Sequence, residues 1–277
     1  IQNEGENMRV RVHAISTLVN FLKGLDNVVD DEEDDVEEID DFSDVLKPYS
    51  KDLLTLLASV FNTSLKINNK SMQEVTLSAI SLISTVLDND FEPFYNDIMP
   101  FLKDLLIKTI QTRNNDNKDL LAQIISTISF ICSSIHNSAD KYMADLKEFC
   151  DIFEGLLSKL KEEDPEVVAI FKAYSHISTS MKTNFYPYLE RIFPVLGTYA
   201  SADIDIKLED IDLEKVTEES SSSPGLVLQT GGVNKKLSLK TFTLQNKVMS
   251  MDVLTDICLN MESSFFPYIE KFLGLVK

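Results

Sequence analysis

The side chains that could carry out catalysis are few and scattered. The three histidines and three cysteines lie far apart along the sequence: His13, His136 and His176, with Cys132, Cys150 and Cys258. The sequence contains no Ser/His/Asp grouping, HExxH, GxGxxG, phosphate-binding glycine loop or CxxC pair. We therefore expect a protein without catalysis, metal or cofactor, and we interpret the cysteines as buried thiols in a reducing compartment.

Acidic side chains are concentrated in two segments, and clustered carboxylates attract cationic partners. Ten of the twelve residues in the first segment are acidic: Asp30, Asp31, Glu32, Glu33, Asp34, Asp35, Glu37, Glu38, Asp40 and Asp41. The second segment, Asp203 to Glu219, has eight acidic and two basic residues and includes Asp210 and Asp212. Either segment could raise the local concentration of a basic partner. The alternative, most natural for the first segment, is a solvated loop.

Three further polar residues could bind a peptide from the surface of helices. Asp252 and Asp256 are four residues apart on a predicted helix, so both carboxylates face the same side and could accept the ammonium of a lysine. Asn20 is predicted to be exposed on another helix, where it could hold the backbone of an extended peptide. The alternative for each is an ordinary solvated helix surface.

Composition indicates which elements position these groups. The chain has 277 residues, is 44% hydrophobic, carries a net charge of -19, and contains only 8 Gly and 8 Pro. So few turn-forming residues argue against an all-β fold. The negative charge argues against nucleic acid or an anionic membrane as the main partner and leaves a basic protein open. No apolar run is long enough for membrane insertion, and the first residues suggest a piece of a longer protein.

A motif of an aromatic residue, one free position, proline and a second aromatic residue recurs along the chain. It occurs at Phe91–Phe94, Phe185–Tyr188 and Phe265–Tyr268, with a weaker copy at Leu46–Tyr49. The first three motif prolines along the chain are separated by 45 and then 94 residues, and the longer distance equals two steps of 47. A period near 46 predicts stacked helix pairs, with the recurring aromatic side chains buried between neighbouring first helices.

The predicted second helices share a small residue followed by an apolar residue four positions later. Three of them have another apolar residue seven positions later, and in the two partial copies that position is Ser134 or Ser180. These small positions are Ala14, Ala79, Thr127, Ala173 and Ser250, separated by 65, 48, 46 and 77 residues. The two long steps exceed the period by about 19 and 31 residues. The excess falls on an acidic loop at 26–41 and an insertion at 201–241. The insertion is predicted to contain a small β-hairpin of Leu226–Gln229 and Lys236–Lys240.

The whole chain, 1–277, is thus predicted to be an all-α superhelical array of about four helix pairs with half a repeat at each end. The expected helices are 8–25, then 46–62 with 70–88, 93–112 with 117–136, 140–162 with 165–182, 186–200 with 242–262, and finally 266–276.

Several segments resemble the HEAT repeats of the importin-beta (karyopherin-beta) nuclear transport receptors, in the importin-five or karyopherin-beta-three branch. Arg9–Phe21 looks like the second-helix motif of that branch, and Phe91–Lys103 resembles its first-helix motif. Glu163–Pro165 and Lys240–Leu244 match in order and spacing. The resemblance covers essentially the whole chain as middle repeats of a longer receptor, whose second helices would line the concave surface.

This resemblance implies a carrier that shuttles between cytoplasm and nucleus. It would bind basic import signals of cargo such as ribosomal proteins and histones, contact nucleoporins, and release cargo when the GTP-bound GTPase Ran binds. The main Ran contacts would lie in repeats absent here. One alternative is a HEAT-repeat scaffold of another class, either a phosphatase scaffold, which would have regular repeats of about 39 residues, or a chromosome-associated organiser. Another is a metal-independent hydrolase.

Overall fold

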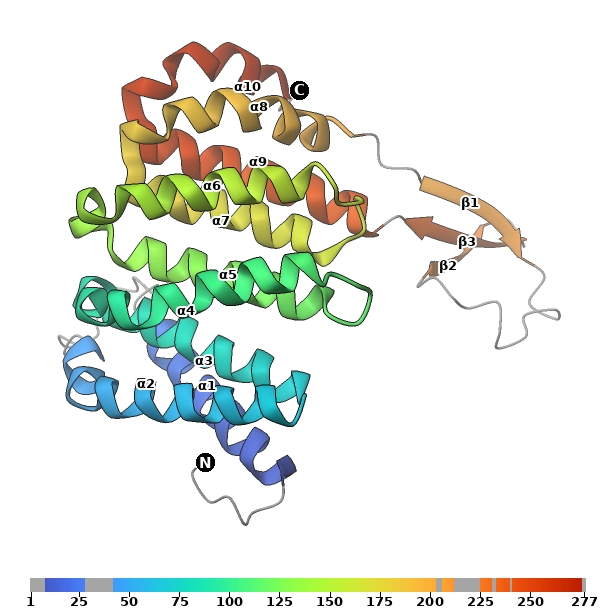
Figure 1. Ribbon diagram of the computed structural model, residues 1–277. Helices are drawn as coiled ribbons and strands as arrows, with labels where there is room; N and C mark the ends of the chain where they lie inside the picture. The colour runs from blue at the N-terminus through green and yellow to red at the C-terminus, as the bar shows by residue number, and fades with distance from the viewer. Residues whose placement is uncertain are drawn as a thin grey trace, which may run out of the picture.

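The computed structural model of the chain describes residues 8–27, 42–202, 206–211, 225–230, 233–239 and 241–275. Its helices stack in chain order from α1 to α10 (Figure 1). The second helices of the pairs are α1 (Met8–Asn27), α3 (Lys70–Leu87), α5 (Lys118–Ser134), α7 (Pro165–Met181) and α9 (Thr241–Met261). The first helices are α2 (Phe42–Lys66), α4 (Glu92–Gln111), α6 (Met143–Leu157), α8 (Tyr186–Ala200) and α10 (Ile269–Leu275). The predicted all-α array of helix pairs is confirmed.

The second helices form a continuous layer in which each helix packs directly on the next, from α1 through α3, α5 and α7 to α9. The small residues predicted at these contacts are fully buried: Ala79, Thr127, Ala173 and Ser250. A small side chain lets two helix axes approach closely, so that the larger apolar residues on either side interdigitate.

Helix α1 departs from the predicted pattern. Its fully buried side chains are Ile15 and Leu22, whereas Phe21, the apolar residue seven positions after Ala14, is 57% exposed. Ala14 and Leu18 are only partly buried. The reason is that α1 packs mainly against α3, and among the described residues no helix covers its other side.

The aromatic motifs are part of the core, as predicted. Phe91, Phe185 and Phe265 are fully buried, each in or just after a 3-10 turn that connects a second helix to the next first helix: η1 (Asp88–Phe91), η3 (Lys182–Phe185) and η6 (Glu262–Tyr268). The rings of Tyr95 and Tyr142 lie 4.0 Å apart across two neighbouring repeats. In the weaker copy the second aromatic residue, Tyr49, is 63% exposed, so that copy does not contribute to the core in the same way.

Serine side chains form hydrogen bonds between successive second helices. One serine of α3, α5 and α7, two positions after the small residue of each helix, makes a hydrogen bond to the following second helix. The three bonds join Ser81 Oγ to Thr127 Oγ1 at 3.0 Å, Ser129 Oγ to His176 Nδ1 at 3.0 Å, and Ser175 Oγ to Asp256 Oδ2 at 2.6 Å. We call these contacts the interhelical serine bonds. Ser81 and Ser129 also bond to a carbonyl of their own helix, so these contacts add a link between helices to side chains that are already satisfied.

A buried ion network joins the N-terminal ends of α5 and α7. Arg113 donates from Nε to Glu166 Oε1 at 2.8 Å, and its Nη2 lies 2.8 Å from Asp164 Oδ2. Lys118 Nζ donates to the other oxygen of Asp164 at 2.5 Å. Burial by itself would raise the pKa of Asp164, but hydrogen bonds from Lys118, from the Lys161 backbone N–H and from Arg113 outweigh it and lower the pKa to about 2. Asp164 is therefore ionised although it is buried.

The insertion between α8 and α9 contains a three-stranded antiparallel sheet, which Figure 1 shows beside the helical stack. Its strands are β1 (Ile206–Ile211), β2 (Gly225–Thr230) and β3 (Val233–Leu239), with β3 in the centre. Strands β2 and β3 lie where the sequence placed a hairpin, whereas β1, which contains Asp210, was not predicted. Asp212 and the first acidic segment, Asp30 to Asp41, lie outside the described residues.

In the part of the chain that the structure describes, no single helix is long and apolar enough to cross a membrane. The segments Lys118–Ser134 and His136–Leu157 satisfy that criterion only together, as a pair bent by 106°.

Replacing Arg113 with Met should reveal the cost of breaking the buried network. Glu166 is fully buried and would lose its guanidinium partner, so we expect the free energy of unfolding to fall by about 3 to 5 kcal/mol. Lys108→Met is the control, because the ion pair of Lys108 with Asp104 is more than 60% exposed on both sides and should contribute less than about 0.5 kcal/mol. Urea unfolding followed by circular dichroism measures both, and equal losses would contradict the structural role.

Candidate partner-binding surfaces

Asp252 and Asp256 lie side by side on α9, on the face opposite the buried Ser250, Leu254 and Ile257. Both are exposed, as the sequence predicted. Asp256 is not isolated, however, because its Oδ2 accepts the 2.6 Å hydrogen bond from Ser175 on α7. The carboxylate pair therefore lies at the interface of two successive second helices rather than on an independent helix surface.

Asn260 extends this polar face of α9 by one more turn. Its Nδ2 donates to Ser178 Oγ at 2.8 Å and to Thr179 Oγ1 at 3.1 Å, both on α7. The spacing of four residues from Asp252 to Asp256 to Asn260 is the sequence signal that could have identified it. Its contacts could not be predicted from the sequence, because its partners lie 81 and 82 residues away.

His176 lies on α7 next to this interface. Its ring is partly buried, lies against Phe130 with centroids 4.5 Å apart, and shares a hydrogen bond with Ser129. Burial lowers the pKa of His176 to about 4, with Lys172 contributing in the same direction and Asp256 opposing it. At neutral pH the imidazole is therefore uncharged and does not neutralise Asp256.

Asn20 is exposed on α1, as predicted, but the structure does not bring it near the α9 carboxylates. Helix α1 packs against α3, while α9 packs against α7 and α8. A single partner that contacts both places would have to extend across the whole second-helix layer.

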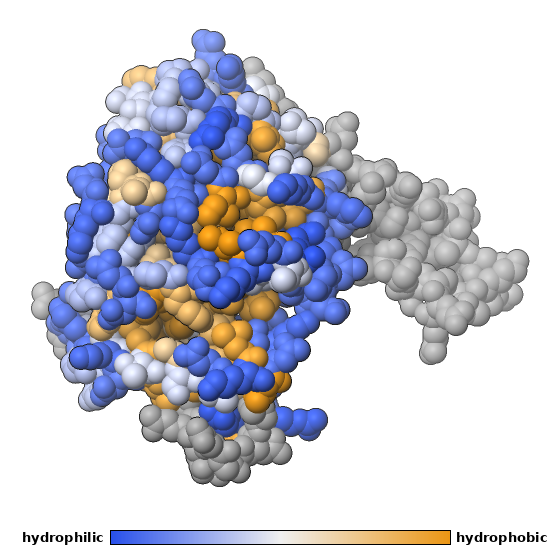
Figure 2. Space-filling view, in the orientation of Figure 1, coloured by the Kyte–Doolittle hydropathy of each residue, from blue (hydrophilic) through white to orange (hydrophobic). Residues whose placement is uncertain are grey.

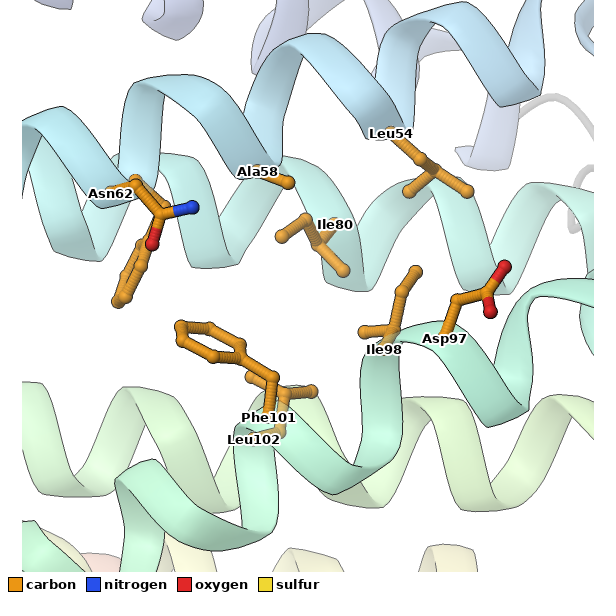
Figure 3. Close-up of a pocket in the computed structure, with 9 residues that line it drawn as sticks. Leu54, Ala58, Asn62, Ile80, Asp97, Ile98, Phe101 and Leu102 are labelled. Carbon is orange, nitrogen blue, oxygen red and sulfur yellow. The ribbon is translucent and has the colours of Figure 1, made fainter.

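The first-helix layer carries an apolar groove that sequence analysis did not find. Between α2 and α4 is a cavity of about 250 Å³ (Figure 3), and Figure 2 shows apolar surface gathered over these helices. Its apolar lining comes from three helices: Leu54, Ala58 and Phe61 of α2, Ile98, Phe101 and Leu102 of α4, and Ile80 of α3. The rings of Phe61 and Phe101 meet edge to face with centroids 5.5 Å apart. Asn62 and Asp97 supply the polar atoms of the lining.

The groove continues toward the start of α4. A second cavity, of about 520 Å³, shares Leu54 and Ala58 with the first and is also lined by Lys51, Pro93 and Phe94. The exposed Ala58 leaves space where a larger side chain would close the groove. The arrangement suits an apolar or aromatic side chain from a partner, with polar groups at its edges.

Among the described residues, no group of three or more His, Cys, Asp or Glu side chains is placed to hold a metal ion. The chemistry offered by these surfaces is recognition through charge, hydrogen bonds and apolar contact.

The family described as importin subunit beta-1-like, TPR repeats, matches residues 36–220. The chain belongs to this importin-beta family. Its helix pairs step by 46 to 48 residues where no insertion intervenes, a length typical of HEAT rather than 34-residue TPR units. Importin subunit beta-3 of Saccharomyces cerevisiae is 25% identical over 264 residues, which is 95% of this chain and 22% of that protein. A probable importin-5 homolog of Dictyostelium discoideum is 23% identical over 232 residues, or 83% of this chain and 19% of that protein.

The chain thus spans about a fifth of the length of the curated relatives it matches. Among solved structures, that of Kap121p has a TM-score of 0.70 with 23% identity, covering 96% of this chain and 22% of Kap121p. Kap121p bound to Nup53p has a TM-score of 0.68 with 22% identity and the same coverage. These similarities establish the shared helical-repeat fold of this importin-beta family member.

The buried His176 should make stability depend on pH. The folded state holds the imidazole neutral down to about pH 4, whereas the unfolded chain takes up its proton near 6.5, so stability should fall as the pH drops through this window. The largest loss from this group is roughly 3 kcal/mol. In His176→Gln the decrease in Tm between pH 7 and pH 4.5 should be smaller by several degrees. His13→Gln, at an exposed position of α1, should keep the full decrease; identical pH profiles in both variants would contradict this assignment.

Proposed function

We propose that this chain is part of a nuclear transport receptor that binds basic import signals in cargo proteins. The observation that supports this most directly is the exposed Asp252–Asp256 pair on the second-helix layer of an importin-beta family member. Both curated relatives are named importins, and Kap121p has been solved bound to Pho4p. Under this proposal the protein acts by binding, without catalysis, and moves between cytoplasm and nucleus.

The chemistry of the carboxylate pair suits a lysine side chain. An ammonium group donates three hydrogen bonds, and two carboxylates on one helix face can share it through charge-assisted contacts. The net charge of -19 further favours basic cargo such as ribosomal proteins and histones. The acidic segments, Asp30 to Asp41 and Asp203 to Glu219, would attract such cargo at longer range. Release by GTP-bound Ran would act mainly through repeats outside this chain.

Replacing both Asp252 and Asp256 with Ser tests the cargo site. We expect the Kd for a fluorescently labelled lysine-rich import peptide, measured by fluorescence anisotropy, to rise about tenfold because two charge-assisted contacts are lost. The Tm should change by no more than a few degrees, since both side chains are exposed. An unchanged Kd would count against the site and favour a scaffold without basic cargo.

Deleting the acidic segment Asp30 to Asp41 is the companion experiment. Interactions at long range are screened by salt, so this deletion should weaken peptide binding at low salt and have little effect at 0.15 M. The loss in the double Asp→Ser variant should persist at both salt concentrations, because it removes direct contacts. Unchanged affinity at low salt would leave the segment as a solvated loop.

A second surface of the same receptor has a specific observation in its favour. The α2–α4 groove is lined by Phe61 and Phe101 and is open enough to admit a further aromatic ring. Kap121p has been solved bound to the nucleoporin Nup53p. We assign to this groove an apolar side chain, such as phenylalanine, from a nucleoporin segment during passage through the pore.

Filling the groove should block that contact. Ala58→Phe places a ring in the space that the partner's side chain would occupy, and Ala58 is exposed, so the fold should tolerate the change. We expect at least a fivefold loss of affinity for a peptide that carries one phenylalanine between polar residues, measured by fluorescence anisotropy. Ser59→Phe, the neighbouring exposed position outside the groove, is the control. Equal affinities for the two variants would rule out the groove.

A further inference from the structure

The α7–α9 interface differs from the other second-helix interfaces in how its helices are connected. Within the other pairs, the first helix leads to the second through three to seven residues, whereas 40 residues separate the end of α8 at Ala200 from the start of α9 at Thr241. Within this connection β1 and β3 pair at Ile206 and Leu239, so the sheet brings the two ends of the insertion together near α8 and α9. The position of α9 against α7 is set in addition by side-chain packing and by the hydrogen bonds between the two helices.

The polar contacts of this interface are made by the same face of α9 that carries the carboxylate pair. Asp256 accepts from Ser175 at 2.6 Å, and Asn260, one turn later, donates to Ser178 at 2.8 Å and to Thr179 at 3.1 Å. Of the three interhelical serine bonds, this is the one whose acceptor is an exposed carboxylate. Ser81 and Ser129 bond instead to Thr127, which is buried, and to the partly buried His176.

From this geometry we infer that Ser175 is a positioning residue for the cation-binding site formed by Asp252 and Asp256. Its hydroxyl holds Oδ2 of Asp256 against α7 and leaves the other oxygen to face a ligand beside Asp252. The inference rests on the proposed binding of basic cargo. It adds that ligand binding is coupled to helix packing, because the site is complete only when α9 is packed against α7.

Two physical effects support this role. An exposed aspartate loses side-chain conformational entropy when it binds a ligand. A side chain that is already fixed by a hydrogen bond avoids much of that entropy loss. The hydrogen bond from Ser175 occupies one of the roughly four acceptor sites of the carboxylate, so the remaining sites stay open to the ligand. By thermodynamic linkage, a ligand that binds more tightly when α9 is packed against α7 must also stabilise the α7–α9 interface.

The test measures the affinity of the full 277-residue chain for the labelled lysine-rich import peptide. Ser175→Ala should raise the Kd about three- to tenfold, the range expected when a side chain is no longer fixed in advance. Ser81→Ala is the matched control, since Ser81 occupies the same repeat position, is similarly buried and also bonds to the next second helix. It should lower the Tm by a similar amount and leave the Kd unchanged.

A double-mutant cycle separates positioning from folding. In an Asp256→Asn background, Ser175→Ala should cause no further loss of affinity, because the charge it positions is already absent. An unchanged or lower Kd in Ser175→Ala, an equal loss in Ser81→Ala, or additive losses in the cycle would each overturn the positioning role. If the Asp252→Ser, Asp256→Ser variant binds the peptide normally, the proposed function itself fails, which distinguishes the two ideas.

Hydrogen exchange provides an independent readout of the coupling. Adding the peptide should increase amide protection in α7 and α9 of the wild-type chain, and much less in Ser175→Ala at equal occupancy. Protection that rises equally in both proteins would mean that the ligand site and the interface are not connected through Ser175.

Discussion

The close approach of successive second helices is the constraint on which the structure depends. It requires a small residue at one position of each helix, and Ala79, Thr127, Ala173 and Ser250 are all fully buried there. Once these helices are in contact, the first helices can only pack on the outside of the layer, and the buried aromatic motifs fill the space between repeats. Each repeat contacts its neighbours, and the buried residues of the described helices form one core that runs along the stack. The two candidate binding surfaces lie on the outside of this core.

Those surfaces divide between the two helical layers. The second-helix layer carries the exposed carboxylates at its α7–α9 interface, whereas the first-helix layer carries the aromatic groove between α2 and α4. One suits charged partners and the other suits apolar side chains. The two surfaces lie on different layers and on different repeats, so under the proposed function a partner on one would leave the other accessible.

Much of the fold could be predicted from the sequence, because a repeat with a period near 46 imposes the same local rules several times. Exposure of Asp252 and Asp256 followed from helical periodicity alone. The bond from Ser175 to Asp256 did not, because the partners are 81 residues apart and an insertion breaks the period between them. The α2–α4 groove could not be predicted from the sequence either, because it depends on the distance between the two helices and not on the sequence of each helix alone. Phe21 follows the same spacing but is exposed, because no other described helix covers that side of α1.

The 40-residue connection between α8 and α9 also bears on how such a protein can evolve. Because β1 and β3 pair at Ile206 and Leu239, the two ends of the segment lie side by side, and residues added between the strands need not move α8 relative to α9. The segment can therefore acquire new charge or a new recognition element at little cost to the helical stack. For the same reason it is a natural position at which to graft a reporter domain or a foreign binding loop into the repeat array.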